Sequence, residues 1–132
     1  MNIQQNISLK EYNTFGISVN AKRFIAVTSV YELKQLLKDE KNIFLISGGS
    51  NMLLTNDIDK MFVHIDIKGI SIDNEDENAV YLTVNAGENW HEFVLWCISN
   101  NYGGLENLSL IFSLINFSKA LSDVVTGSYP FP

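Results

Sequence analysis

The spacing of apolar residues predicts a strand, a helix and a second strand in the first third of the chain. Residues 24–28 are typical of a short strand, and Ser29 and Glu32 after it match a capping box that begins a helix. The continuous apolar run 43–46 is typical of a strand buried on both faces. Together these elements predict a βαβ unit. The residues that predict the buried side of the helix are Val30, Leu33 and Leu37.

Alternating apolar positions predict two more strands, at 62–67 and 80–84, and a second helix follows them. The acidic run 73–78 lies between these strands and predicts a solvated hairpin tip. Asn89, with Glu92 three residues later, predicts the start of the helix. Between α+β and α/β we assign the fold class α+β, with about four or five strands and two main helices. The expected buried side of the second helix comprises Trp90, Phe93, Val94, Cys97 and Ile98.

Composition and charge narrow the class of protein. The 132 residues are 46% hydrophobic and 18% charged, which excludes a disordered chain and favours one domain with a sizeable core. Nine basic against fifteen acidic residues give a net charge of −6, which argues against a nucleic-acid-binding surface. No apolar run is long enough to span a bilayer, no signal peptide is evident, and the single cysteine forms no internal disulfide. We therefore expect a cytoplasmic protein with neither a nucleic-acid nor a membrane partner.

The strongest candidate for chemistry is the glycine-rich turn directly after the buried strand. Adjacent glycines let the backbone adopt positive φ and direct successive N–H groups at one point, where an anion such as a pyrophosphate binds. From spacing alone, a plain tight turn is the better interpretation, because the turn matches neither the P-loop nor the dinucleotide-binding fingerprint. The residues of this turn are Ser47, Gly48, Gly49, Ser50 and Asn51.

For the other reactive side chains, a structural role is a better interpretation than a metal-binding or catalytic role. His91, with acidic neighbours, is more typical of a solvated helix end than of a metal site. His64 is far from His91 in the sequence, and the two histidines do not have the spacing of a metal-ligand pair. The run 73–78 lacks the glycine and the glutamate of a calcium loop. Cys97 is most simply a core residue, and no catalytic triad or nucleophile elbow occurs. We therefore expect no metal site, and the motifs alone indicate only a domain with one possible phosphate-binding turn.

Four short motifs occur in an order that resembles one known family. Each is modestly specific. Together, at these spacings, they resemble the amino-terminal part of UDP-N-acetylenolpyruvoylglucosamine reductase, a flavoenzyme of peptidoglycan precursor synthesis and cell-wall biogenesis. The motifs are Asn13-Thr14-Phe15-Gly16-Ile17, Gly48-Gly49-Ser50-Asn51, Ala86-Gly87-Glu88-Asn89-Trp90-His91 and Gly104-Leu105-Glu106-Asn107-Leu108-Ser109-Leu110-Ile111.

The resemblance implies an FAD-binding fold of the vanillyl-alcohol-oxidase (PCMH) type, with residues 1–111 as the FAD-binding region. It also implies that NADPH reduces the flavin and that the hydride passes to the enolpyruvyl group of a UDP-sugar, giving UDP-N-acetylmuramate. The turn at 47–51 would hold the FAD pyrophosphate, with close-approaching amides from Gly48 and Gly49 and side-chain donors from Ser50 and Asn51. The family often has glycine where Ser47 stands.

The resemblance stops after Ile111. Residues 112–132 replace the family's glycine-rich stretch around the flavin, and the family's catalytic regions have no counterpart in this sequence. We therefore expect a truncated or frame-disrupted form that binds FAD weakly at most and has no reductase turnover alone. The alternatives are a non-catalytic interaction module and a fragment without a selected role.

The tail at 112–132 has a helical pattern of its own. Its apolar residues repeat at intervals of three and four, which predicts an amphipathic helix after Ser113. Such a helix would cover exposed core or drive self-association. The residues that predict it are Leu114, Phe117, Leu121 and Val124 or Val125.

Overall fold

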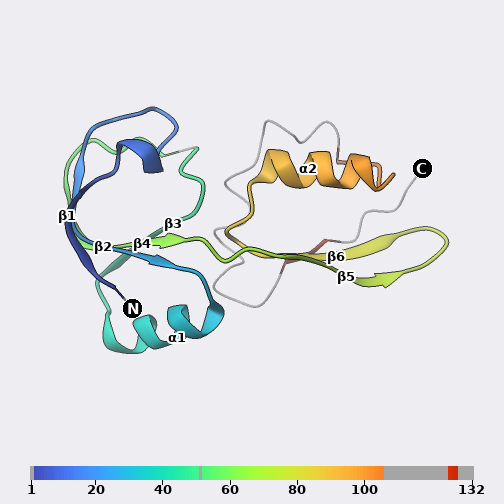
Figure 1. Ribbon diagram of the computed structural model, residues 1–132, viewed down its shortest axis with the longest axis horizontal. Helices are drawn as coiled ribbons and strands as arrows, with labels where there is room; N and C mark the ends of the chain where they lie inside the picture. The colour runs from blue at the N-terminus through green and yellow to red at the C-terminus, as the bar shows by residue number, and fades with distance from the viewer. Residues whose placement is uncertain (1, 51, 106–124, 128–132) are drawn as a thin grey trace. The chain divides into compact units, whose positions relative to one another are not determined.

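The computed structural model describes residues 2–50, 52–105 and 125–127, and it divides the chain into two compact units (Figure 1). The units are Met1–Ile67 and Lys68–Pro132. Length alone favoured a single domain, whereas each unit has a sheet of its own. The expected mixture of helices and strands is confirmed.

The first unit is built on a four-stranded sheet with the order β1-β2-β4-β3. β1 (Gln4–Ser8) is antiparallel to β2 (Asn20–Val27), whereas β4 (Ile58–Ile65) is parallel to both β2 and β3 (Ile43–Ile46). The strands predicted near 24–28, 43–46 and 62–67 are therefore present. The predicted βαβ unit differs in one respect, because β4 lies between β2 and β3 and pairs with each of them.

Two helices lie in the connections of this unit. The 3₁₀ helix η1 (Lys10–Tyr12) lies between β1 and β2, and α1 (Val30–Asp39) lies between β2 and β3. Ser29 caps α1 as predicted, because its side chain accepts the Glu32 N–H at 3.2 Å. The Glu32 carboxylate accepts from the N–H and hydroxyl of Thr28, and these bonds lower its pKa.

The predicted buried side of α1 is partly wrong. Val30 is 51% exposed and Leu37 is 36% exposed, whereas Leu36 is only 3% exposed. A periodic pattern gives the spacing of apolar residues on a helix. It does not give the rotation of the helix about its axis when several leucines compete, because packing against the sheet decides that rotation.

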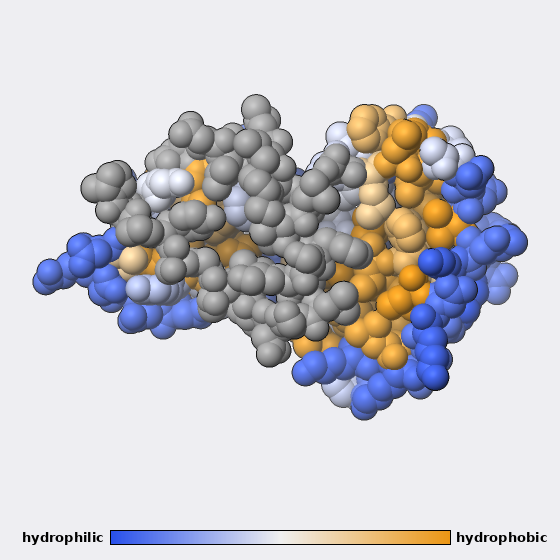
Figure 2. Space-filling model, turned by 180° about the vertical axis from the view of Figure 1, so that it is seen from behind, coloured by the Kyte–Doolittle hydropathy of each residue, from blue (hydrophilic) through white to orange (hydrophobic). Residues whose placement is uncertain are grey.

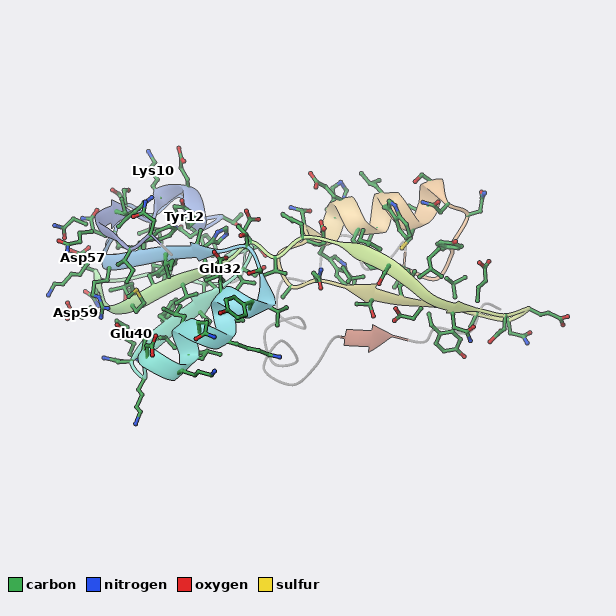
Figure 3. All side chains as sticks on the ribbon, turned by 60° about the horizontal axis from the view of Figure 1, so that its bottom comes forward. Lys10, Tyr12, Glu32, Glu40, Asp57 and Asp59 are labelled. Carbon is green, nitrogen blue, oxygen red and sulfur yellow. The ribbon has the colours of Figure 1, made fainter. Side chains whose placement is uncertain are left out.

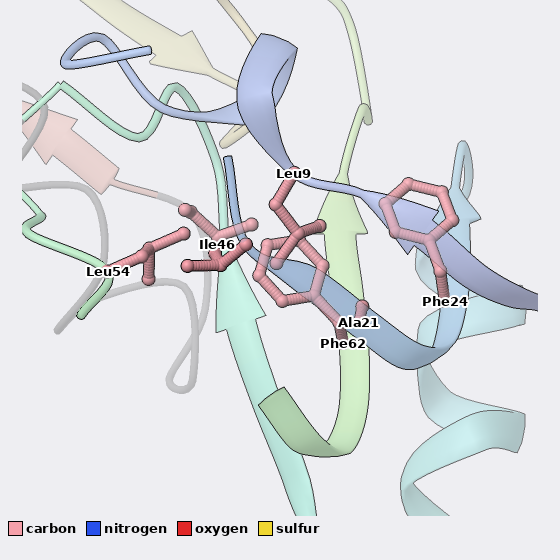
Figure 4. Packing of buried hydrophobic residues seen from close by; sticks show 7 residues of the cluster. Leu9, Ala21, Phe24, Ile46, Leu54 and Phe62 are labelled. Carbon is pink, nitrogen blue, oxygen red and sulfur yellow. The ribbon is translucent and has the colours of Figure 1, made fainter. Parts of the chain in front are cut away.

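One face of the first sheet buries the main hydrophobic cluster of the unit (Figure 4). Its aromatic rings pack closely: the Phe62 ring is stacked with Phe24 at 5.8 Å and with Phe44 at 5.5 Å between centroids. Tyr12 of η1 adds a tilted ring 4.8 Å from Phe24. η1 is therefore fastened to the sheet through an aromatic contact. The fully buried members of the cluster are Leu9, Val19, Ala21, Phe24, Ile46, Leu54 and Phe62.

An ion pair joins β2 to the end of α1. Both terminal nitrogens of the Arg23 guanidinium donate to the Glu40 carboxylate, with Nη1 at 3.3 Å from Oε2. Glu40 directly follows α1 (Figure 3). The hydrogen bonds from Arg23 lower the pKa of Glu40 below its ordinary value near 4.5.

This ion pair predicts a pH-dependent contribution to stability. A carboxyl whose pKa is lower in the folded chain stabilises it above the unfolded pKa, and that stabilisation is lost as the pH falls through the folded pKa. Glu40→Gln is therefore expected to lower the free energy of unfolding at neutral pH, and the deficit is expected to shrink below about pH 4.5. Urea denaturation at both pH values measures it. Glu77→Gln, at an exposed hairpin position, is the control, and a deficit independent of pH would contradict the prediction.

The second unit contains an antiparallel sheet with the order β5-β6-β7 and one α-helix. The strands are β5 (Ile70–Glu75), β6 (Val80–Val84) and β7 (Val125–Gly127), and the helix is α2 (Trp90–Ser99). The predicted strand at 80–84 is confirmed as β6. Of the helix predicted in the tail, Val125 belongs to β7, and residues 112–124 lie outside the described part of the chain.

The start of α2 and the hairpin tip are as predicted. The Asn89 side chain accepts the N–H of Glu92 at 3.1 Å and caps the helix. At the exposed hairpin tip, the Asp76 carboxylate accepts the N–H groups of Asn78 and Ala79. The second half of the acidic run, 76–78, is therefore a turn fastened by its own side chain, whereas residues 73–75 belong to β5. None of the helices in the described residues is long and apolar enough to cross a membrane.

The core of the second unit lies between α2 and the sheet. Phe93, Val94 and Cys97 are buried as predicted, together with Leu105. Ile98 was expected on the same side but is about half exposed, so that part of the prediction is wrong. The residue lies one helical step beyond Cys97, at the margin of the apolar face.

Candidate functional site

The glycine-rich turn leaves the carboxyl end of β3. The parallel strands β2 and β4 end at the same edge of the sheet, which is where ligands bind in parallel α/β sheets. Ser47 is half-buried, Gly48 and Ser50 are exposed, and Gly49 is buried. Asn51, the fifth residue of the predicted site, lies outside the described residues. The four described residues are thus placed together at the edge expected for a ligand.

Gly49 has a backbone conformation that only glycine accommodates here. Its φ is +63°, in the left-handed region. A Cβ atom at this position would lie 2.1 Å from the carbonyl oxygen of Tyr12, far inside van der Waals contact. Both the torsion angle and the close approach of another backbone therefore require glycine.

Among the described residues, no backbone carbonyl accepts from the N–H groups of the two glycines, Gly48 and Gly49. The turn is fastened instead through the Gly49 carbonyl, which accepts the Thr14 N–H at 3.2 Å. Successive amides in a turn that contains a left-handed residue form an anion-binding concavity. The turn can therefore bind an anion without first breaking a backbone bond.

A second loop braces this turn. Asn13 is 5% exposed, and its amide makes three bonds: Nδ2 donates to the carbonyls of Leu9 at 2.7 Å and Ile17 at 3.0 Å, and Oδ1 accepts the Ile17 N–H at 2.9 Å. Gly16, also at φ +63°, completes the loop by donating its N–H to the Asn13 carbonyl. The loop at 13–17 therefore positions the backbone that contacts Gly49.

The loop at 13–17 had no predicted role in the site, although its residues form one of the four motifs of the resemblance. The available signal was Asn13 followed three residues later by Gly16, because both residue types are typical of turns. This signal does not indicate which segment the loop contacts, namely the turn at Gly49.

The glycine-rich turn offers hydrogen-bond donors rather than charged or reactive side chains. The described turn contains no lysine, arginine or carboxylate, so its donors are backbone N–H groups and the hydroxyls of Ser47 and Ser50. Neutral, preorganised donors of this kind bind phosphate groups strongly. Among the described residues no group of histidine, cysteine, aspartate or glutamate is arranged to hold a metal ion.

Apolar side chains are exposed near the turn in the sequence. Phe15, next to Thr14, is 60% exposed, and Leu53, four residues after Gly49, is 65% exposed. Figure 2 shows a broad hydrophobic area on the visible face of the first unit, bordered by hydrophilic residues. Ligand sites commonly combine an apolar surface with a few directed polar groups.

The motif at 86–91 has a structural role in the second unit. The Lys68 ammonium donates to the Gly87 carbonyl, and the Glu88 carboxylate accepts the Gly69 N–H at 2.6 Å. Glu88 therefore holds the backbone at the start of β5, and His91 is exposed on α2. Most of the fourth motif, from Glu106 onward, lies outside the described residues.

Comparisons with known proteins show which proteins this chain is similar to. No protein-family model matches the chain. The UDP-N-acetylenolpyruvoylglucosamine reductase of Flavobacterium johnsoniae is 61% identical over 113 residues, which cover 84% of this chain and 34% of that protein. The protein of the same name from Amoebophilus asiaticus is 48% identical over 115 residues, again 84% of this chain and 34% of the relative.

A solved structure gives the same result. The crystal structure of UDP-N-acetylenolpyruvylglucosamine reductase from Thermus caldophilus matches with a TM-score of 0.61 and 26% identity, over 84% of this chain and 38% of that one. The chain spans about a third of the length of the curated relatives it matches. It is therefore homologous to UDP-N-acetylenolpyruvoylglucosamine reductases, over a stretch that makes up about a third of those proteins.

Proposed function

We propose that this chain is the FAD-binding part, of the PCMH type, of an NADPH-dependent UDP-N-acetylenolpyruvoylglucosamine reductase. In this proposal the turn at 47–51 binds the pyrophosphate of FAD. The observation that carries it is the pair of glycine N–H groups, which donate to no described residue and lie at the carboxyl edge of a parallel sheet. The homology to the reductases supports the choice of ligand.

The charge of the protein makes directed N–H groups necessary. With a net charge of −6, the chain as a whole repels a pyrophosphate, so an electrostatic field from basic residues does not explain binding. Two convergent amides offset this repulsion locally, and the hydroxyls of Ser47 and Ser50 add donors at the same edge. Asn51 is proposed as a further side-chain donor.

In the proposed activity the cofactor supplies the hydride chemistry and this chain binds the cofactor. Bound FAD supplies hydride transfer from NADPH to the enolpyruvyl double bond of a UDP-sugar. The residues of this chain bind and orient the phosphate end of the cofactor, and the brace at 13–17 keeps the turn in its binding conformation. We assign no catalytic residue to this chain, and we propose that the UDP-sugar is a substrate of the longer relatives.

The proposal predicts that a negative charge in the turn abolishes binding. Gly48 is exposed, so Gly48→Asp places a carboxylate beside the two amides, whereas Gly48→Asn adds nearly the same volume without charge. We expect FAD to bind the Asp variant about tenfold or more weakly than the Asn variant, because like charges in contact cost several kcal/mol. Titration with FAD, followed by flavin fluorescence anisotropy, measures both affinities.

Two outcomes would contradict the proposal. Equal affinities of the Asp and Asn variants would exclude a pyrophosphate at this turn, because the charge difference would then have no anion to act on. A purified wild-type chain that shows neither flavin absorption nor FAD binding would exclude the FAD assignment for this chain. That second result would favour a non-catalytic interaction module.

A further inference from the structure

His64 lies at the same edge of the sheet as the glycine-rich turn. In β4 it pairs in register with Ile46, the last residue of β3, and the turn begins at the next residue. Register neighbours on parallel strands point to the same face, about 5 Å apart. Ile46 belongs to the buried cluster on the face that also carries Tyr12, so His64 lies on that face as well.

Tyr12 contacts both His64 and the turn. Its ring is 5.1 Å from the imidazole ring of His64, in an edge-on arrangement, and its backbone carbonyl lies against Gly49. One residue of η1 thus fixes the position of the imidazole and of the buried glycine together. His64 is half-buried, so part of the residue is accessible to solvent.

The residues paired with His64 across the sheet are uncharged. These register neighbours are Ala26 in β2 and Ile46 in β3. Titratable groups near it include Tyr12 from η1, which is in ring contact, and Asp66, two residues further along the chain, which donates its N–H to the Val27 carbonyl. The turn itself has no basic residue, so a protonated imidazole would supply the positive charge that the turn lacks.

We propose that His64, in its protonated form, contacts the phosphate groups of the dinucleotide bound at the turn and makes binding tighter in mild acid. This inference rests on the proposed function and adds a residue and a pH dependence to it. An imidazolium donates a charge-assisted hydrogen bond to a phosphate oxygen, and neutral imidazole loses most of that interaction. The pyrophosphate of FAD stays fully ionised across this range, so the histidine is the group that titrates.

The test is FAD affinity as a function of pH. Flavin fluorescence anisotropy at about pH 5.5 and about pH 8 spans the ordinary titration range of histidine. We expect the wild-type chain to bind about tenfold more tightly at the lower pH, the usual size of a charge-assisted bond. His64→Gln is expected to bind weakly at both values. His91→Gln, at the exposed histidine of α2, is the matched control and should behave as wild type.

A second variant separates binding from packing. His64→Phe keeps a ring against Tyr12, so its thermal unfolding should stay close to wild type while the pH dependence of binding disappears. Wild-type affinity that is equal at both pH values, or pH dependence retained in His64→Gln, would overturn this inference alone. Absence of FAD binding by the wild-type chain at both pH values would overturn the proposed function and this inference with it.

Discussion

Gly49→Ala is expected to lower the free energy of unfolding of the first unit by about 2–5 kcal/mol. The left-handed conformation at φ +63° costs an alanine roughly 1–2 kcal/mol. The new Cβ would also lie 2.1 Å from the Tyr12 carbonyl oxygen, and moving that backbone costs about 1–3 kcal/mol more. Urea denaturation followed by far-UV circular dichroism measures the loss. Tryptophan fluorescence is not suitable for the first unit, because both tryptophans lie in the second unit.

Gly16→Ala is the matched control for this prediction. Gly16 has the same φ of +63°, but a Cβ there would meet nothing within 4 Å. It should therefore cost only the conformational part, roughly 1–2 kcal/mol. The difference between the variants measures the crowding between Gly49 and Tyr12. Equal losses would mean that the turn and η1 do not approach each other as described.

Asn13→Ala is expected to destabilise the first unit by about 3 kcal/mol or more. The side chain is buried and satisfies three backbone groups, namely the carbonyls of Leu9 and Ile17 and the Ile17 N–H. Alanine would leave these groups without their partner, and a buried polar group in that state costs about 1–3 kcal/mol. Chemical denaturation measures this loss, and FAD titration should show weaker binding, because the loop that braces Gly49 is released.

Asn74→Ala provides the comparison at an exposed asparagine of β5. A surface change of this kind is expected to shift the free energy of unfolding by no more than about 0.5 kcal/mol. If Asn13→Ala cost as little as Asn74→Ala, the amide would not be holding the loop. Asn13→Asp at low pH, where the carboxyl is neutral, keeps the acceptor for the Ile17 N–H and has one O–H donor in place of two N–H donors, so it should fall between wild type and alanine.

The sequence predicted well the features that depend on neighbouring residues. Helix starts at Ser29 and Asn89 followed from side-chain caps, whose partners lie three residues away. The strand β3 and the exposed hairpin tip followed from unbroken runs of one residue type, although only Ile46 of β3 is buried and the strand lies at an edge of its sheet rather than buried on both faces. In each case the physical cause lies within a few positions of the residue itself.

Features that depend on distant partners were not predictable in this way. β1 and β5 consist mostly of exposed residues and show little alternation, so they form strands because a neighbouring strand offers hydrogen bonds. The insertion of β4 between β2 and β3 follows no local rule. The candidate site contains both kinds of feature. The glycine pair could be identified from the sequence, whereas its contact with Tyr12 and its proximity to His64 depend on how distant segments pack together.

The position of β4 has a consequence for how the binding edge forms during synthesis. In the described sheet β3 pairs with β4 and with no other strand, and β4 comes later in the chain. Pairings between distant segments form slowly, and nascent chains emerge from the amino terminus. A ribosome that has released residues only as far as Ser50 therefore presents a β3 without a neighbour. We expect the double-glycine segment to acquire its shape only after Ile65 has emerged, too late for cofactor to guide the earlier steps.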